Sequence, residues 1–319
     1  MASIQHITIL VPVYNEEQGV IQVIERLDKL IAQSSEKISV LFIDDGSKDD
    51  TAILLQRNIE GKENYSAVFL SRNFGHAPAL SAGMQEVAET NADAVFIIDG
   101  DLQDPPELLP IFLEKMREGY DVVYGIRKNR KEGLLKRICY RIYYRLQHRF
   151  ASISMPLDAG DFSLVTKKIV TLINGLPEES RYIRGLRSWV GYKQAGIGYE
   201  RDERVHGTSK YSLGALIKLA FNGIFNFSEL PIRFIVTTGI VSIGFALVYL
   251  GITVYKKLVY GTVPEGFTAL IFAIVLFSGV QLLSLGIIGQ YVVRIFFQVK
   301  QRPLFIVKSK IINGKQVDG

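Results

Sequence analysis

Hydrophobic residues in the last third of the chain form two long uninterrupted runs. Residues Phe234 to Tyr255 and Phe267 to Val293 contain no Asp, Glu, Lys or Arg. Each run exceeds the roughly 20 apolar residues that cross about 30 Å of hydrocarbon as a helix. A buried core helix is the alternative for either run. The pattern favours two transmembrane helices joined by the short segment 256–266, with both outer ends on the same side of a membrane.

Short apolar runs in the first hundred residues alternate with segments of helical periodicity. The runs are Ile7 to Val11, Val40 to Ile43, Ala67 to Leu70 and Ala94 to Ile98. Helical patterns lie between them, for example at Val20 to Ile31 and Ala77 to Ala88. Strands without polar alternation, separated by helices, are typical of a parallel sheet that is covered on both faces. The expected fold class is therefore α/β.

These patterns predict four consecutive regions. We expect a catalytic domain over residues 1–210 with a basic amphipathic helix at about 131–150, a juxtamembrane amphipathic helix over 211–232, two transmembrane helices within 233–293, and a basic tail over 294–319. The first 13 residues lack the basic start of a secretory signal, and the tail is rich in Lys and Arg, so we expect domain and tail in the cytosol. Lys256 and Lys257 in the opposite loop weaken this charge asymmetry.

Composition narrows the functional class only modestly. The chain is 48% hydrophobic and 22% charged, with mean hydropathy +0.18 and a net charge of +5. This charge suits anionic lipid headgroups or phosphates, and no nucleic-acid-binding motif accompanies it. Cys139 is the single cysteine, which excludes an internal disulfide and fits a reducing compartment.

Acidic residues follow three of the four predicted strands. The loops read Pro12-Val13-Tyr14-Asn15-Glu16-Glu17, Asp44-Asp45-Gly46-Ser47 and Asp99-Gly100-Asp101-Leu102-Gln103. Ligands of open α/β sheets bind beyond the carboxyl ends of the strands, so these carboxylates are candidates for a site, although loop carboxylates are ordinarily solvated caps. Neither a dinucleotide-binding glycine pattern nor a Walker phosphate loop is present. Asp99 and Asp101 suit a hard cation, Mg²⁺ or Mn²⁺, that also binds substrate phosphates.

Six motifs in order along the first 210 residues resemble those of the family 2 inverting glycosyltransferases, and among them the dolichyl- or polyprenyl-phosphate hexose synthases. The motifs are Pro12-Val13-Tyr14-Asn15-Glu16, Asp44-Asp45-Gly46-Ser47 with Asp49 and Thr51, Arg72-Asn73-Phe74-Gly75, Asp99-Gly100-Asp101-Leu102-Gln103-Asp104-Pro105-Pro106, Asp158-Ala159-Gly160-Asp161-Phe162, and Arg204 with Gly207, Ser209 and Lys210. One departure is Ser163, where many members of the family have arginine.

The resemblance implies a nucleotide-diphosphosugar transferase (GT-A) fold and a set of site residues. It implies Pro12, Tyr14, Glu16 and Asp45 around the nucleotide, Asp99, Asp101 and Gln103 around the metal, and Arg127 and Arg204 facing the phosphates. The catalytic candidates are Asp101, Asp158 and Asp161, the last two as groups that orient the sugar or accept a proton. The two spans resemble those of bacterial polyprenyl-phosphate glucosyltransferases. This favours UDP-glucose as donor, with GDP-mannose as the alternative, and a multi-pass protein of a bacterial-type inner membrane.

Two segments are candidates for binding the lipid acceptor. Arg137, Arg141, Arg145 and Arg149 recur every four residues and would form one basic face of a helix, either at the membrane interface or as an ordinary solvated face. Together with Lys210 they are candidates for contacts with the acceptor phosphate. The segment Tyr211 to Phe227 is apolar except for Lys218, as expected of a helix on the membrane surface or in a core. Glycines in the spans allow close helix packing and a homo-oligomer.

Three other functions were considered. A processive polysaccharide synthase normally has more spans and a Gln-x-x-Arg-Trp element, which this sequence lacks. Transfer to a lipid hydroxyl would require a true base and would give Asp158 more importance. A non-catalytic membrane scaffold would leave the acidic loops as caps, which three acidic clusters in family order argue against. The sequence therefore predicts hexose transfer from a nucleotide-sugar to a polyisoprenyl phosphate.

Overall fold

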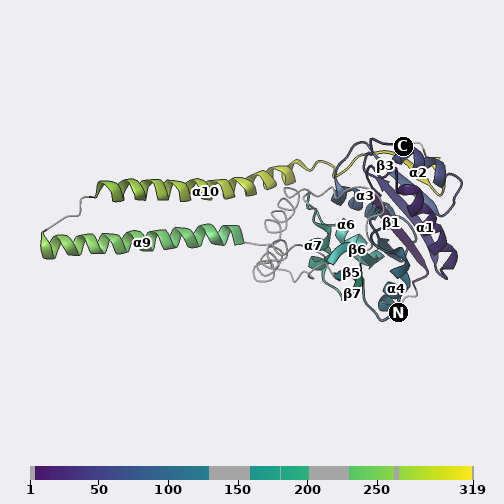
Figure 1. Cartoon of the computed structure of the whole chain (residues 1–319), viewed down its shortest axis with the longest axis horizontal. Helices are drawn as coiled ribbons and strands as arrows, with labels where there is room; N and C mark the ends of the chain where they lie inside the picture. Colours follow the sequence, from purple (N-terminus) through teal and green to yellow (C-terminus); the bar gives the residue numbers. More distant parts are fainter. Residues whose placement is uncertain (1–3, 129–158, 180, 201–229, 262–265, 318–319) are drawn as a thin grey trace.

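Two parts make up the structure: an α/β domain and a pair of long helices that project from it (Figure 1). The structure is a computed structural model that describes residues 4–128, 159–179, 181–200, 230–261 and 266–317. Within these residues, nine strands form one sheet in the order β7-β5-β6-β4-β1-β2-β3-β8-β9. The strands are His6–Val13 (β1), Lys37–Asp44 (β2), Tyr65–Leu70 (β3), Ala94–Ile97 (β4), Val122–Lys128 (β5), Ala159–Thr166 (β6), Gln194–Glu200 (β7), Val307–Ile312 (β8) and Lys315–Val317 (β9).

The four apolar runs of the sequence are four parallel strands at the centre of this sheet. β1 pairs with β2 and β4, and β2 pairs with β3. Successive side chains point to opposite faces of a strand, and here both faces are buried. Ile9 and Val11 pack in one core, whereas Leu10 packs in the other. Burial on both faces explains why these strands show no polar alternation, and the predicted α/β class is confirmed.

Helices cover both faces of the sheet. Apolar residues from three helices fill the first core: Val20–Gln33 (α1), Thr51–Ile59 (α2) and Leu109–Arg117 (α4), the last preceded by the 3₁₀ turn Pro106–Leu108 (η1). The second core receives His76–Ala88 (α3), Lys167–Asn174 (α6) and Ile183–Val190 (α7). Helices α1 and α3 match the two periodic segments of the sequence within two residues. Their regular apolar stripes made them predictable.

Beyond β4 the sheet becomes mixed. β6 is antiparallel to both β4 and β5, and β7 is parallel to β5. Phe162 of β6 packs against Phe96, Phe112 and Tyr199, with ring centroids 5.0–5.3 Å apart, and this cluster joins the two halves of the sheet. The register pairs Ile97 with Ser163, so the chain just before Ser163 runs alongside the acidic loop that follows β4.

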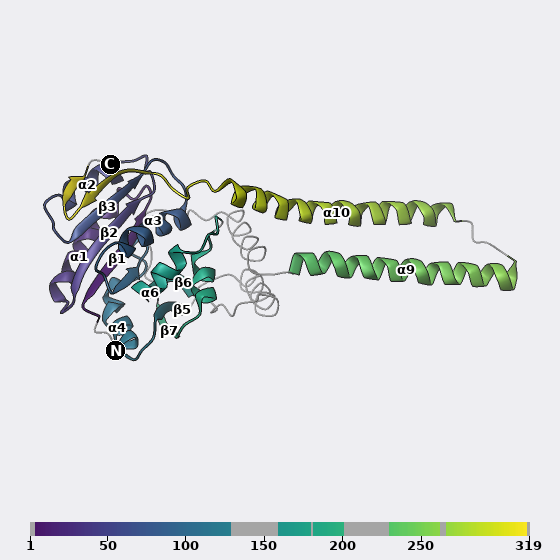
Figure 2. The same ribbon diagram turned by 180° about the vertical axis from the view of Figure 1, so that it is seen from behind.

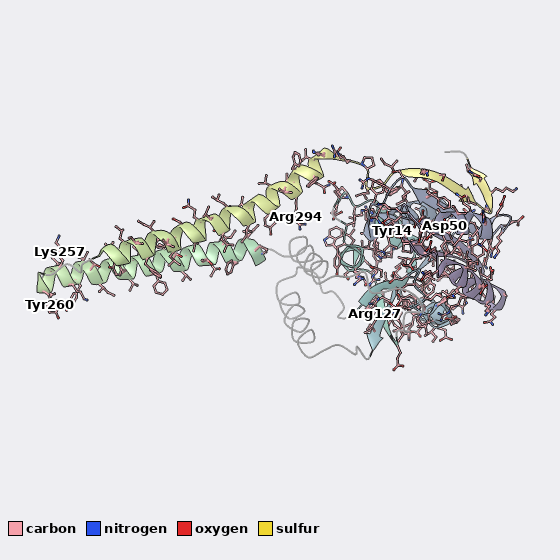
Figure 3. The ribbon with its side chains drawn as sticks, turned by 45° about the horizontal axis from the view of Figure 1, so that its top comes forward. Tyr14, Asp50, Arg127, Lys257, Tyr260 and Arg294 are labelled. Carbon is pink, nitrogen blue, oxygen red and sulfur yellow. The ribbon has the colours of Figure 1, made fainter. Side chains whose placement is uncertain are left out.

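The two apolar runs are helices longer than predicted. Leu230–Tyr260 (α9) has 31 residues and Phe267–Lys300 (α10) has 34. They lie side by side as a hairpin, and both views show it projecting away from the domain (Figures 1 and 2). Most of their large apolar side chains are exposed, and each helix is long and apolar enough to cross a membrane. Lys257 and Tyr260 lie at the far tip, and Arg294 lies towards the domain (Figure 3).

The C-terminal segment, expected to be a basic tail over residues 294–319, contains the end of α10 and two strands of the sheet. The first seven of these residues extend α10, and β8 then joins the edge of the central sheet, antiparallel to β3. Ile311 is buried in the first core, and Lys310 Nζ contacts Glu86 Oε1 at 2.5 Å. The segment that follows the hairpin therefore belongs to the same sheet as the N-terminal strands.

The base of the hairpin also contacts the domain directly. Gln298 of α10 donates a hydrogen bond from Nε2 to the carbonyl of Pro177 at 2.6 Å, and its Oε1 accepts one from the Glu179 N–H at 3.0 Å. Pro177 and Glu179 belong to the loop between α6 and α7. One amide side chain therefore links the hairpin to this loop of the domain.

Candidate active site

The three acidic loops meet at one edge of the sheet. β4, β1 and β2 are neighbours and parallel, so their carboxyl ends lie side by side. The ladder pairs Val13 with Asp44 at the ends of β1 and β2. This is the edge at which open α/β sheets bind ligands. The arrangement brings together the loops that carry Tyr14, Asp45 and Asp99.

Hydrogen bonds connect the loop after β1 to the loop after β2. The Asn15 N–H donates to Ser47 Oγ at 2.9 Å, and the Glu16 N–H donates to Thr51 Oγ1 at 2.8 Å. Asn15 has φ 52°, in the left-handed region that asparagine tolerates better than most residues. Pro12 is buried at the end of β1, while Tyr14 and Glu16 are half-buried in the loop. Of the predicted nucleotide contacts, Tyr14 and Glu16 are therefore accessible.

Asp45 organises the neighbouring loop. Its two carboxylate oxygens accept hydrogen bonds from the Phe74 and Gly75 N–H groups at 2.7 and 2.8 Å. Burial raises the pKa of Asp45, although these two hydrogen bonds act in the opposite direction. Gly46 has φ +65°, and a Cβ there would lie 2.3 Å from the backbone carbon of Arg72, so only glycine permits this close approach. The Arg72-to-Gly75 motif of the sequence is thus fixed against the Asp45 loop.

The loop after β4 presents the predicted metal ligands. Asp99, Asp101 and Gln103 are all half-buried there, and the Gln103 N–H donates to Asp101 Oδ1 at 3.2 Å. No group of three or more His, Cys, Asp or Glu side chains that could hold a metal ion occurs in the part of the chain that the structure describes. Two carboxylates and an amide therefore fit Mg²⁺ or Mn²⁺ only if substrate phosphates and water complete the coordination. Mg²⁺ commonly binds in this way.

Arg127 lies at the end of β5 among buried polar groups. Its Nε donates to Tyr199 Oη at 3.3 Å, and Tyr199 donates to Asp104 Oδ1 at 2.5 Å. Arg127 Nη2 is 4.0 Å from the same carboxylate oxygen of Asp104. Burial opposes the charge of Arg127, but Asp104 and Tyr199 outweigh it and raise the pKa of the guanidinium. Arg127 is thus anchored inside the domain behind the acidic loop.

Asp161 lies on β6 and is held by two basic side chains. Arg184 of α7 donates from Nε to Asp161 Oδ1 at 3.0 Å and from Nη2 to Oδ2 at 2.9 Å, and His76 Nε2 is 3.3 Å from Oδ2. Burial alone would raise the pKa of Asp161, but Arg184 and His76 outweigh it and hold the pKa well below its usual range. The Asp161 carboxylate therefore stays ionised and bound to Arg184 and His76.

His76 and Arg184 are site residues that were not predicted from the sequence. His76 directly follows the Arg72-to-Gly75 motif and is the first residue of α3, so its position could have been noticed. Arg184 and Arg187 are three residues apart on α7, a spacing that puts both on one helix face. Arg187 is buried and donates to the Gly160 carbonyl at 3.3 Å. The sequence around Arg184 and Arg187 contains no pattern that predicts their contacts with β6.

Several predicted residues lie outside the described part of the chain. These are Asp158, Arg204, Lys210 and the basic residues Arg137, Arg141 and Arg145. The amphipathic helix predicted at about 131–150 and the segment Tyr211 to Phe227 fall there as well. Their assignments stay predictions from the sequence.

Comparison with known proteins gives one family across the chain. The profile described as Glycosyl transferase family 2 matches residues 8–172, just over half of the chain. The chain is 41% identical over 312 residues to "Uncharacterized glycosyltransferase YkcC" of Bacillus subtilis (strain 168), which covers 97% of this chain and 96% of that protein. It is 34% identical over 304 residues to "SfII prophage-derived bactoprenol glucosyl transferase" of Shigella flexneri, with 95% and 97% covered.

Solved structures are less similar. Glucosyl-3-phosphoglycerate synthase from Mycobacterium tuberculosis, in complex with Mn²⁺, UDP-glucose and phosphoglyceric acid, matches with a TM-score of 0.48 at 19% identity. The match covers 69% of this chain and 77% of that chain. This similarity is too low to carry an argument about the site. The sequence relatives, which span the α/β domain and the hairpin together, carry the comparison.

Proposed function

This chain belongs to glycosyl transferase family 2, and from that premise we propose that it transfers glucose from UDP-glucose to a polyprenyl phosphate at the cytosolic face of a membrane. The chain is a glycosyltransferase, and its α/β domain has the GT-A fold that the sequence resemblance implied. The assignment of the acceptor rests on the similarity to proteins named bactoprenol glucosyl transferase. It extends over 95% of the chain and includes both long apolar helices.

The chemistry of the acceptor favours a direct displacement. A phosphate monoester has its second pKa near about 6, so it is already a nucleophilic anion at neutral pH. One phosphate oxygen attacks the anomeric carbon of the sugar, and the bond from that carbon to the nucleoside diphosphate breaks on the opposite face. The configuration is inverted, and the electron pair leaves with the diphosphate. No proton has to be removed from the nucleophile.

This displacement assigns different tasks to the carboxylates. Asp99, Asp101 and Gln103 would hold a divalent cation, which supplies positive charge to the departing diphosphate. Tyr14 and Glu16, half-buried in the loop after β1, are the proposed contacts to the nucleotide. Asp161 is a poor general base because Arg184 and His76 hold its pKa low and bind both of its oxygens. We therefore assign Asp161 a positioning role and leave Asp158 as the candidate base if a hydroxyl acceptor were used.

The hairpin and its charges support a membrane location. Two apolar helices long enough to span a membrane separate the catalytic domain from β8, and β8 pairs with β3 of that domain. Both ends of the hairpin must then lie in one compartment, which supports a protein with two spans. The Lys and Arg residues after the second span favour the cytosol for that compartment, as in a bacterial inner membrane. A polyprenyl phosphate in the same bilayer would present its phosphate at this surface.

A donor and acceptor panel tests the proposal. The purified full-length protein in lipid nanodiscs is incubated with radiolabelled UDP-glucose, UDP-galactose or GDP-mannose, and with polyprenyl phosphate, diacylglycerol or no acceptor. We expect label in the lipid extract only with UDP-glucose and polyprenyl phosphate, and a product of inverted anomeric configuration by NMR. Transfer from GDP-mannose alone would identify a mannose synthase instead. Label that appears only with diacylglycerol would overturn the phosphate acceptor.

A further inference from the structure

His76 lies between two acidic regions of the site. It is the first residue of α3, directly after the loop that Asp45 fixes, and its Nε2 is 3.3 Å from Asp161 Oδ2 on β6. The His76 side chain is 41% exposed, whereas that of Asp161 is 9% exposed. The imidazole therefore has one nitrogen against a buried carboxylate while much of its ring remains open to solvent.

Arg184 fixes the orientation of that carboxylate. Its two hydrogen bonds to Asp161, at 3.0 and 2.9 Å, form the bidentate arrangement that is the most specific geometry between these side chains. Asp161 cannot rotate without breaking at least one of these bonds. Arg184 thus fixes Asp161, and Asp161 in turn orients His76. An acidic residue orients a histidine in this way in many active sites.

The charges around His76 favour the imidazolium. Asp161 of β6 attracts the positive charge, and Asp99 after β4 does so only while no cation is bound to it. Asp45 lies one loop away, while Arg184 of α7 and the positive end of α3 oppose the charge. Burial lowers the pKa of His76, but the hydrogen bond and the charge of Asp161 raise it, and the net pKa lies above the usual value. An imidazolium carries N–H on both nitrogens. With Nε2 engaged, Nδ1 makes no hydrogen bond to any described residue.

Resting on the proposed function, we propose that His76, held by Asp161 and Arg184, is a cationic hydrogen-bond donor to a phosphate oxygen of the reacting substrates. The carboxylates of Asp45, Asp99 and Asp101 repel a phosphate unless the divalent cation and basic side chains compensate their charge. His76 supplies such charge at the start of a 13-residue helix, where the helix dipole also favours an anion. The phosphate belongs to the diphosphate of the donor or to the lipid acceptor, and both present the same oxygen chemistry.

The matched variants are His76→Gln and His6→Gln. His6 is at the amino end of β1, away from the site, and contacts Ser39 Oγ at 2.7 Å. Glutamine keeps a hydrogen-bond donor but removes the charge. Replacing a charge-assisted hydrogen bond by a neutral one predicts a fall in kcat/KM of roughly 10- to 100-fold, about 1.4–2.7 kcal/mol, for His76→Gln and no change for His6→Gln. Unchanged kinetics in His76→Gln would overturn the proposal.

Separate kinetic parameters identify which phosphate is bound. A rise in KM for the nucleotide-sugar, with slower hydrolysis of donor in the absence of lipid, assigns the contact to the donor diphosphate. A rise in KM for polyprenyl phosphate, with donor hydrolysis unchanged, assigns it to the acceptor. Absence of transfer by the wild-type protein would refute the proposed function, whereas equal transfer by wild type and His76→Gln would refute only the role of His76.

The pH profile separates a charged role from a structural one. The imidazolium is present below the folded pKa of His76 and is lost as pH rises through it, so wild-type kcat/KM should fall on the alkaline side. His76→Gln should lose this alkaline fall and keep the acid-side fall that comes from protonation of the acceptor phosphate. Asp161→Asn removes the negative charge that raises the pKa of His76, so its alkaline fall should move to lower pH. A uniform loss of activity at every pH in both variants would show a structural role and overturn the proposal.

Discussion

Ile311 and Ala67 are register partners in β8 and β3, although both long apolar helices lie between them in the sequence. Ile311 is 6% exposed and packs in the same core as Ala67. A strand that follows the hairpin therefore completes a sheet that begins before it. This pairing constrains the topology of the chain, because two segments of one sheet cannot lie on opposite sides of a membrane.

Cysteine labelling tests this topology. In a Cys139→Ser background, Tyr260→Cys at the hairpin tip should react with a membrane-impermeant maleimide in intact cells. Lys315→Cys should react only after the cells are permeabilised, because β9 belongs to the α/β domain, which we propose to lie in the cytosol. Labelling of Lys315→Cys in intact cells, with Tyr260→Cys protected, would show the opposite orientation. In both orientations, a transmembrane hairpin requires that one of the two sites is labelled in intact cells and the other is protected.

Burial of Ile311 should stabilise the domain. Ile311→Asp loses the burial of a large apolar side chain, worth about 1.5–3 kcal/mol, and adds the cost of burying a carboxylate. Ile312→Asp is the matched control, since Ile312 is adjacent on the same strand and 43% exposed. Thermal unfolding in detergent should show a clearly lower Tm for Ile311→Asp than for Ile312→Asp. Equal Tm values would indicate that β8 is not part of the folded domain.

Gln298 should hold the domain at a fixed position on the hairpin. Gln298→Ala removes both hydrogen bonds to the loop at Pro177 and Glu179, together worth about 1–3 kcal/mol. We expect a severalfold higher KM for membrane-embedded polyprenyl phosphate and an unchanged KM for the nucleotide-sugar, whose site lies at the edge of the central sheet. Gln290→Ala on the same helix is the control, since Gln290 is exposed. Equal effects of the two substitutions would refute the positioning role.

A divalent cation should be required, and Asp101→Asn should abolish transfer without unfolding the protein. An amide keeps the shape of the side chain but loses the charge that binds the ion. Turnover and Tm are measured with and without excess chelator, and metal binding is followed separately by Mn²⁺ electron paramagnetic resonance. Glu89→Gln, an exposed charge change after α3, serves as the control. Near-normal turnover of Asp101→Asn, or full activity in chelator, would contradict the assignment.

The basic residues predicted to face the lipid give a further prediction from the sequence. Cations near an anionic membrane surface contribute about 1 kcal/mol each, so Arg141→Gln with Arg145→Gln should raise KM for embedded polyprenyl phosphate more than tenfold. The KM for the nucleotide-sugar and the rate of donor hydrolysis should change little. An equal loss for donor and acceptor would assign these arginines to the nucleotide or the fold. No loss would leave them as a solvated helix face.

Local patterns in the sequence determined the central strands and the hairpin. β1 to β4 are apolar on both faces, and the two spans lack charge over more than 20 residues, so each is recognisable without knowledge of its neighbours. The three acidic loops follow from the same strands, because parallel neighbours end at one edge. Motif order then identified the family, which the comparisons confirm.

Only the tertiary structure decided which residues surround the edge of the sheet at which the acidic loops meet. β5 to β7 contain glycines and lack an uninterrupted apolar run, and β8 is a basic segment whose place beside β3 depends on partners far away in the sequence. Asp161 was identified as a candidate from its motif, but its engagement by Arg184 and His76 depends on α7, β6 and α3 packing together. Residue type and spacing act locally, whereas the protonation and task of a side chain depend on charges that folding brings within a few ångströms.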